Sequence, residues 1–281
     1  GSELRAVLAH PAVSHELDLQ GVSRYLAFDY VPDPHTIVRG IRKLPPAHTL
    51  TASGGKVSVE SYWEIPFRPT AAVDEADWCL EIARRLEEAV RQRLVSDVPV
   101  GCFLSGGIDS AAIVATAARE RAGIRTFSVG FAEGAYDERR FARIVAERFA
   151  TQHEELVVSA GDALAVLPQL GALLDEPLAD MSFVPLYLLS RAARRSVTVA
   201  LTGDGGDELF AGYPTMAADW WHGKFAWLPR GLRQALGTVT EQLSVVPEPL
   251  REFLRALEYG PHARNQALLG GLPPGRHPAL L

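Results

Sequence analysis

Residues 98–110 read VPVGCFLSGGIDS, a short apolar run followed directly by a polar, glycine-rich loop. The run from Val98 to Leu104 has the composition of a strand that is buried on both faces of a parallel sheet. The glycines let the backbone approach a ligand closely, and a helix that starts near Ile108 would point its positive end at the loop. A strand, a glycine loop and a helix in this order favour a phosphate-binding turn.

The same alternation of apolar and helical segments continues along the chain. We expect strands at residues 98–104, 125–131, 154–158 and 197–201. Helical patterns separate them, at residues 108–122, 137–150, 160–174 and 182–195. Strands that alternate with helices are typical of a doubly wound parallel sheet, whose ligands bind at the carboxyl ends of the strands. The predicted fold class is therefore α/β with such a sheet.

A second loop of the same kind follows the last of these strands. Residues 202–208 read TGDGGDE, with three glycines and three carboxylates. A carboxylate beside a phosphate site repels the anion unless a metal ion lies between them, so we interpret Asp109 in the first loop as a magnesium ligand. Structural roles stay open, with Asp109 as a helix-cap residue and residues 202–208 as a solvated acidic turn. A Walker-type loop is excluded because no Lys-Ser or Lys-Thr follows the required glycine spacing.

The first sixty residues have a different pattern. We expect an amphipathic helix over residues 18–30 with Asp18 as its cap, and β-rich segments at 36–44, 48–52 and 56–62. Ser53-Gly54-Gly55 between the last two segments is a hairpin signal. We interpret this part as the closing strands of an α+β sheet.

A domain boundary is expected near residue 70. The stretch PFRPTAAV at 66–73 holds two prolines and lacks periodicity, as a linker does. A long helix is predicted over 74–96 because apolar residues recur there at four-residue steps: Trp78, Ile82, Leu86, Val90 and Leu94. The predicted organisation is a domain at 1–66, a linker at 67–73 and a second domain at 74–281.

Composition excludes several classes of protein. A formal net charge of -6 over 281 residues argues against a nucleic-acid partner, and no apolar run is long enough to suggest a membrane span. The two cysteines, Cys79 on a predicted helix and Cys102 in a predicted buried strand, read as structural residues and do not require an oxidising compartment. The start carries no secretory signal. We therefore expect small-molecule substrates, no membrane and a cytoplasmic location.

These segments together resemble the asparagine synthetase family. SGGIDS at 105–110 resembles the pyrophosphate loop of many ATP pyrophosphatases, and GDGGDELF at 203–210 narrows the resemblance to asparagine synthetases. YLAFDYVPDPHTIVRGIRKLPPAHTL at 25–50 resembles the end of the glutaminase domain that precedes the synthetase domain. The resemblance implies a sheet of the ATP-pyrophosphatase (adenine nucleotide α-hydrolase-like) type at 74–281, preceded by part of a class II glutamine amidotransferase domain at 1–66.

The resemblance also implies roles for individual residues. The pyrophosphate of ATP would lie against Ser105, Gly106, Gly107, Asp109 and Ser110. Magnesium would be held by Asp109 and Asp207. The adenosine part would be bordered by Leu104, Val129, Thr202 and Gly203. Asp204 would be the catalytic acidic residue that helps to form an acyl-adenylate, at a position where many relatives carry Glu.

The implied reaction is the ATP-dependent amidation of aspartate to asparagine through β-aspartyl-AMP, with release of pyrophosphate and AMP. Ammonia would come from glutamine in the full-length protein, ATP and Mg²⁺ are the expected cofactors, and a homodimer is the candidate assembly. Three related activities stay open: a β-lactam synthetase-like, a lasso-peptide cyclase-like and a polysaccharide-cluster amidotransferase activity. A binding-only role also stays open. Because the family's N-terminal nucleophilic cysteine and C-terminal catalytic lysine have no counterpart here, we expect the chain to be a catalytically incomplete piece of a longer protein.

Overall fold

The computed structural model describes residues 1–66, 73–132, 137–225, 227–229, 231–233, 235–236, 247–260, 264 and 268. The chain divides into two compact units. The first unit comprises Gly1–Phe67, Gly171–Asp180 and Ala211–Leu281, and the second comprises Arg68–Leu170 and Met181–Phe210. All residues predicted to bind ATP or magnesium belong to the second unit. Residues 67–72 of the predicted linker lie outside the described residues.

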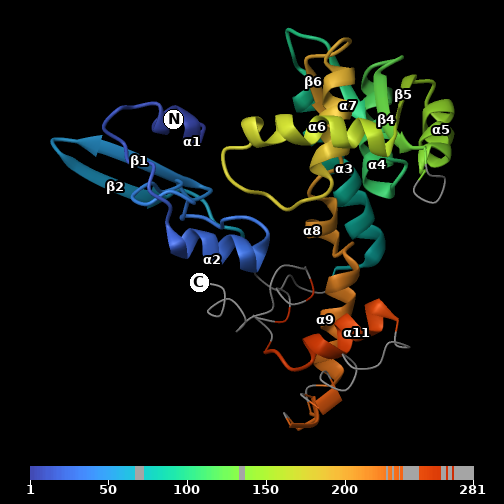
Figure 1. Ribbon diagram of the computed structural model, residues 1–281. Coiled ribbons are helices and arrows are strands. Elements are labelled where there is room, and N and C mark those ends of the chain that lie inside the picture. The colour runs from blue at the N-terminus through green and yellow to red at the C-terminus, as the bar shows by residue number, and fades with distance from the viewer. Residues whose placement is uncertain are drawn as a thin grey trace. The chain divides into compact units, whose positions relative to one another are not determined.

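Four parallel strands form the sheet of the second unit (Figure 1). They are β3 (Val100–Phe103), β4 (Arg125–Phe131), β5 (Gln152–Val158) and β6 (Val199–Leu201), and their order across the sheet is β5-β4-β3-β6. The chain runs outward from β3 through β4 to β5 and then returns to the other side of β3 for β6. This reversal between β3 and β6 is the topological switch point at which doubly wound sheets bind their ligands.

Helices pack on both faces of this sheet. One face contacts the helices that flank the first loop, α3 (Glu75–Leu94), α4 (Ile108–Glu120) and α5 (Arg139–Arg148), around the buried Cys102 and Leu104. The opposite face presents Phe127 and Val129 to α6 (Ala160–Leu173) and α7 (Phe183–Ala193). The predicted α/β fold class is therefore confirmed, together with its strands and helices. None of the described helices has the length and apolar character needed to cross a membrane.

The outer strands are less buried than their apolar sequences predicted. In β5, exposed and half-buried residues alternate over most of its length, and β6 has no fully buried residue. Both strands lie at the edges of the sheet as described, whereas β3 and β4 are flanked by strands on both sides. The expectation of burial on both faces holds for the central strands and is wrong for the edges.

The first unit contains a hairpin and several short helices. Its elements are α1 (Leu4–Leu8), α2 (Leu19–Phe28), β1 (His48–Ser53), β2 (Lys56–Ser61), α9 (Pro214–Lys224) and α11 (Glu248–Ala256). The hairpin is confirmed: Ser53 pairs with Lys56, and Gly54 and Gly55 have φ values of 57° and 75°, as a two-residue turn of this hand requires. The Asp18 cap is also confirmed, since its side chain accepts a hydrogen bond from the backbone N–H of Gln20 at 2.9 Å.

Residues 36–44 do not form the predicted strand. Within this stretch only Val38 makes an isolated antiparallel bridge. The Thr36 hydroxyl donates to the carbonyl oxygens of Val38 at 2.8 Å and Ile41 at 3.0 Å, and Gly40 has a φ of 82°. The stretch therefore folds back on itself, because side-chain hydrogen bonds to the backbone replace those of a sheet ladder.

Candidate functional site

Both predicted loops lie at the switch point of the sheet. The first loop, residues 104–110, follows β3 and leads into α4, and the second loop, residues 202–207, follows β6 and leads into the short helix α8 (Gly206–Phe210). β3 and β6 are paired in parallel, with Cys102 opposite Leu201. The two loops therefore leave the sheet at the carboxyl ends of adjacent strands, where the sequence predicted the chemistry to lie.

The two loops touch at Asp109. A Cβ atom added to Gly206 would lie 2.5 Å from Asp109 Cγ, and one added to Gly203 would lie 2.8 Å from the backbone nitrogen of Ser110. Real Cβ atoms do not approach other heavy atoms so closely, so a side chain at Gly203 would press on the backbone of α4 and one at Gly206 would displace the Asp109 carboxylate. Glycine at 203 and 206 is thus what allows the second loop to contact the first turn of α4.

Hydrogen bonds hold the first loop in a closed turn. The hydroxyl oxygens of Ser105 and Ser110 lie 2.9 Å apart, Ser105 Oγ accepts from the N–H of Gly107 at 3.3 Å, and Ser110 Oγ donates to the Gly107 carbonyl at 3.1 Å. Gly106 has a φ of 90°, which favours glycine, and a Cβ there would lie 2.6 Å from the backbone nitrogen of Ala142 in α5. The loop is therefore packed against α5 on its other side.

The N-terminus of α4 provides an anion-binding end. Gly107 is its N-cap residue, and no side chain among the described residues caps this end. The first N–H groups of the helix and its positive dipole end are thus available to an anion. Asp109 lies half-buried in this first turn, where its carboxylate would repel a phosphate unless a cation lay between them.

The second loop is a tight turn that orients Asp204. The Thr202 hydroxyl donates to Asp204 Oδ2 at 2.9 Å and accepts from the Asp204 N–H at 3.4 Å. Gly205 has a φ of 91°, and the N–H of Gly206 donates to the Gly203 carbonyl at 3.2 Å. Asp204 is exposed, so its carboxylate is accessible at the tip of the loop.

Asp109 and Asp207 are the two carboxylates that the sequence predicted to hold magnesium. Asp207 directly follows the glycine that contacts the Asp109 carboxylate, and it lies in the first turn of α8. Magnesium is usually held by one or two carboxylates together with substrate phosphates and water. Over the part of the chain that the structure describes, no group of three or more His, Cys, Asp or Glu side chains could hold a metal ion. Asp109 and Asp207 would supply two carboxylates of this kind, and their binding of magnesium stays a prediction.

The residues predicted to border adenosine lie on both sides of the sheet. Leu104 is 1% exposed in the core between the sheet and α4, and its N–H donates to the Phe127 carbonyl at 2.8 Å. Val129 is half-buried on the opposite face, near the carboxyl end of β4. The structure thus gives both side chains packing roles, and their contact with a nucleotide stays a prediction.

The two cysteines lie where the sequence predicted. Cys102 is fully buried in β3, and burial raises the pKa of its thiol to about 12, so the reactive thiolate is disfavoured at neutral pH. Cys79 is exposed on α3. Neither position belongs to the two loops.

The sequence did not predict that α5 packs against the first loop. Besides its approach to Gly106, this helix sends the side chain of Arg139 across Gly130, so closely that a Cβ at 130 would overlap it. A glycine inside a predicted strand is the available signal, because such glycines often mark the close approach of another group. Which group approaches depends on the fold and could not be predicted.

Comparison with known proteins gives consistent matches. Residues 81–278 match the family model of asparagine synthase, and residues 1–63 match that of a glutamine amidotransferase domain. A putative glutamine-hydrolyzing asparagine synthetase of Mycobacterium tuberculosis is 36% identical over 240 residues, which cover 84% of this chain and 36% of the relative. Asparagine synthetase 1 of Bacillus subtilis is 34% identical over 237 residues, 84% of this chain and 37% of the relative. A putative asparagine synthetase of Methanocaldococcus jannaschii is 37% identical over 221 residues, 76% of this chain and 42% of the relative.

The chain thus spans about two fifths of the length of these curated relatives, from 36% to 42%. Among solved structures, an NH3-dependent NAD synthetase from Campylobacter jejuni is 13% identical with a TM-score of 0.33, over 66% of this chain and 94% of that one. The asparagine synthase model, in contrast, covers both loops and the whole parallel sheet of the second unit. This chain belongs to the asparagine synthase family.

Proposed function

We propose that this chain supplies the ATP-using centre of a glutamine-hydrolysing asparagine synthetase. The observation that carries the proposal is the contact of Gly203 and Gly206 with the first turn of α4, at Ser110 and Asp109. It joins two glycine-rich loops with carboxylates at the switch point of a parallel sheet, the usual place for a nucleotide. Family membership and the names of the relatives support the same activity and do not favour the related cyclases.

The first loop is proposed to hold the pyrophosphate part of ATP. Hydroxyls of Ser105 and Ser110 and the N–H groups that begin α4 would donate to phosphate oxygens. Leu104, Val129, Thr202 and Gly203 are proposed to border the adenosine. This division is the one that the family resemblance implies; Leu104 directly follows β3, and Val129 lies near the carboxyl end of β4.

The proposed reaction begins when a β-carboxylate oxygen of aspartate attacks the α-phosphorus of ATP. The bond between that phosphorus and the pyrophosphate oxygen breaks, and β-aspartyl-AMP forms. Ammonia then attacks the acyl carbon, and AMP leaves with the oxygen that aspartate supplied. Positioning of the reactants and neutralisation of the leaving pyrophosphate are expected to supply most of the acceleration. Magnesium held by Asp109 and Asp207 would contribute to that neutralisation.

Asp204 is proposed to assist the formation of the adenylate. Asp204 is exposed in the second loop, which follows β6. The Thr202 hydroxyl donates a hydrogen bond to Oδ2 and thereby fixes the orientation of the carboxylate. A fixed carboxylate in this loop can orient the attacking substrate or its ammonium group. The proposal makes Asp204 a residue of the chemical step, separate from the two that would hold magnesium.

The organisation of the whole protein is also part of the proposal. Residues 1–66 would be the C-terminal part of a glutamine amidotransferase domain, 67–73 a linker, and 74–281 the synthetase domain. Substrates would be aspartate with glutamine or ammonia, in a cytoplasmic protein that forms a homodimer. The boundary between the two compact units at Phe67 supports the position of the linker, although Gly171–Asp180 and Ala211–Leu281 group with the first unit.

Pyrophosphate release by the full-length protein tests the function. The protein is supplied with ATP, magnesium and ammonia, and with one carboxylate at a time: aspartate, glutamate, a β-amino acid or a peptide. We expect release to require aspartate and to yield one asparagine for each pyrophosphate. Release with another carboxylate alone would assign one of the related activities, and ATP binding without release would assign a binding-only role.

A further inference from the structure

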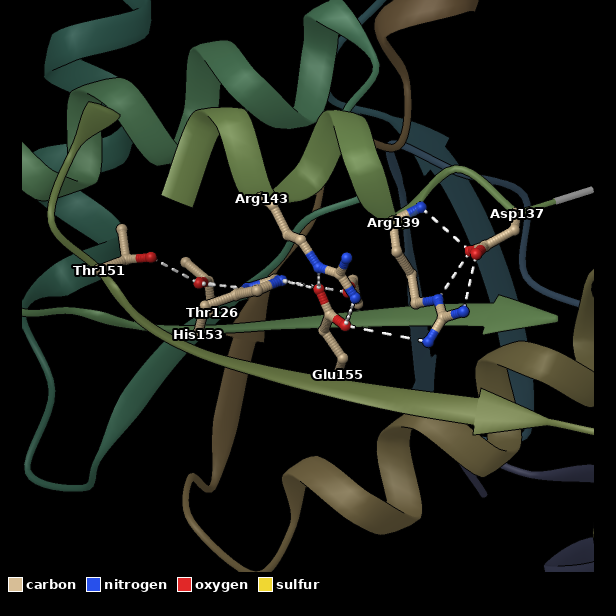
Figure 2. A network of polar contacts seen from close by, with 8 residues as sticks. Thr126, Asp137, Arg139, Arg143, Thr151, His153 and Glu155 are labelled. Carbon is tan, nitrogen blue, oxygen red and sulfur yellow. Dashed lines mark hydrogen bonds and ion pairs between the residues drawn. The ribbon is translucent and has the colours of Figure 1, made fainter. Parts of the chain in front are cut away.

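A chain of polar side chains lies between α5 and the strands β4 and β5. Figure 2 shows it as a continuous series of hydrogen bonds and ion pairs, from the amino ends of the strands towards the loop that precedes α5. Its members include Thr151, Thr126, His153, Glu155, Arg143, Arg139 and Asp137. None of these residues belongs to the two loops of the candidate site.

Glu155 is the central anion of this network. Arg143 donates from Nε and Nη2 to the two carboxylate oxygens of Glu155, both at 2.6 Å, and Arg139 Nη1 lies 3.9 Å from Oε2. The Glu155 side chain is 18% exposed. Arg143 is 55% exposed, so solvent screens this pair in part, but its bidentate geometry makes it more directional than a single-contact ion pair. In keeping with this, the hydrogen bonds from Arg143 lower the pKa of Glu155.

The side of the sheet below α5 offers polar contacts beside the apolar core that contains Cys102 and Leu104. Thr126 and Ser128 face His153 across the two strands and bond its ring nitrogens at 2.9 Å and 3.2 Å. The buried residues of α5 are Ala142 and Ala146. Alanine contributes less hydrophobic free energy than larger apolar residues because its side chain is small. The position of α5 on the sheet therefore depends on the ion pairs of Glu155 as well as on this apolar core.

The first turn of α5 packs directly against the first loop. A Cβ at Gly106 would lie 2.6 Å from both the backbone nitrogen of Ala142 and Cβ of Phe141. Arg139, at the start of the helix, crosses Gly130 at the end of β4. A movement of α5 would therefore change the space that is available to the loop at Gly106.

We propose that Glu155 is a positioning residue for the phosphate-binding loop. Its ion pairs with Arg143 and Arg139 fix the position of the first turns of α5. The helix in this position keeps Gly106 and its neighbours in the conformation that binds phosphate. Glu155 does not itself touch the nucleotide. The inference rests on the proposed ATP-binding function of the first loop.

Glu155→Gln tests it, because the amide keeps the shape of the side chain and removes its charge. The dissociation constant of Mg-ATP, measured by calorimetry on the chain, is expected to rise about tenfold, the lower end of what supporting contacts of a site contribute. Arg143→Met should give a similar rise, and Arg143→Lys should recover part of it. The double variant should bind less weakly than the sum of the two single effects predicts, because both substitutions break the same pair between Glu155 and Arg143.

Glu81→Gln is the matched control. Glu81 accepts from Arg84 at 2.8 and 2.9 Å and from Arg85 at 2.6 Å on the exposed side of α3, so the same change removes an equally well-formed ion pair elsewhere in the second unit. This control should leave the Mg-ATP affinity unchanged. A Glu155→Gln variant that melts at a lower temperature yet binds Mg-ATP as tightly as the unsubstituted chain would overturn the proposal.

A second measurement separates this inference from the proposed function. Amide hydrogen exchange of residues 105–110 is followed in the nucleotide-free chain, where no ATP binding is required. We expect faster exchange in Glu155→Gln and unchanged exchange in Glu81→Gln. Unchanged exchange in Glu155→Gln would overturn the inference, whereas failure of the unsubstituted chain to bind Mg-ATP would overturn the proposed function.

Discussion

The backbone of Gly206 lies against the carboxylate of Asp109: a Cβ at position 206 would stand 2.5 Å from Cγ and 2.7 Å from Oδ1. The second loop therefore limits the directions in which the Asp109 carboxylate can point. Asp207, the second proposed magnesium ligand, comes next in the chain after Gly206. The contact between Gly206 and Asp109 therefore joins the two loops into one candidate site.

Gly206→Ala should disturb this site without unfolding the protein. The added methyl group meets the end of a short side chain that can rotate away, so the melting temperature should change little while Asp109 loses its position. We expect the Mg-ATP dissociation constant to rise about tenfold, which corresponds to about 1.4 kcal/mol. Calorimetry on the chain measures it, with Gly161→Ala as control because a Cβ there has its nearest neighbour, Ser159 Oγ, at 3.6 Å. Equal affinity in both variants would contradict the role of the contact.

Asp109→Asn and Asp207→Asn should each lower magnesium-dependent pyrophosphate release in the full-length protein. Each removes a negative charge that would hold the cation beside the leaving group, and the loss of one such electrostatic contact costs on the order of 10² to 10³ in rate. The rate is measured against magnesium concentration at fixed ATP. Asp162→Asn, an exposed carboxylate on α6 that bonds to Ser159, is the control. Full activity in either loop variant rules out that residue as a ligand.

Asp204→Asn should separate binding from chemistry. The variant keeps the hydrogen bond from Thr202 and removes the charge, so the affinity for Mg-ATP should stay within about twofold while adenylate formation slows by on the order of 10². Single-turnover pyrophosphate release measures the chemical step. If the single-turnover rate is unchanged, Asp204 acts only in the structure of the loop.

Acidification should destabilise the protein partly through His153. Burial lowers the pKa of His153, with Glu155 opposing this shift and Arg143 adding to it, so the folded state keeps the ring neutral below its ordinary pKa of about 6.5. The unfolded state then binds more protons as the pH falls below 6.5, and stability declines until the folded pKa is passed. One such group changes the unfolding free energy by no more than about 1.4 kcal/mol for each pH unit.

His153→Gln should remove this contribution. Urea unfolding at pH 7.5 and 5.5 should show a smaller loss of stability in the variant than in the unsubstituted chain. Burial also lowers the pKa of His222, but that residue is present in both proteins and its effect cancels in the difference. An identical loss in the two proteins would show that His153 is equally solvated in the folded and unfolded states.

The loops of the candidate site could be predicted because their signals are local. The apolar runs before Ser105 and Thr202, and the glycines after them, each occupy about ten consecutive residues and require no knowledge of distant contacts. Residues 36–44 were predicted wrongly because the Thr36 hydroxyl bonds to nearby carbonyl groups and replaces a strand by a turn. Composition alone does not distinguish these two uses of threonine.

The surroundings of the site could not be predicted for a different reason. Glu155 lies beside Ser128 only through the register of β4 and β5, and it meets Arg143 only because α5 packs on that face. In the sequence these residues are an ordinary acidic residue on a strand and an ordinary basic residue on a helix. Their roles depend on contacts between segments, which periodicity and spacing do not report.

The path of oxygen in the reaction tests the central claim most directly. The full-length protein is supplied with ATP, magnesium, ammonia and aspartate labelled with ¹⁸O in its β-carboxylate, and the products are examined by mass spectrometry. Because the carboxylate attacks the α-phosphorus, we predict AMP that carries one ¹⁸O atom and pyrophosphate that carries none. Unlabelled AMP, or ADP in place of AMP, would contradict the proposed formation of β-aspartyl-AMP.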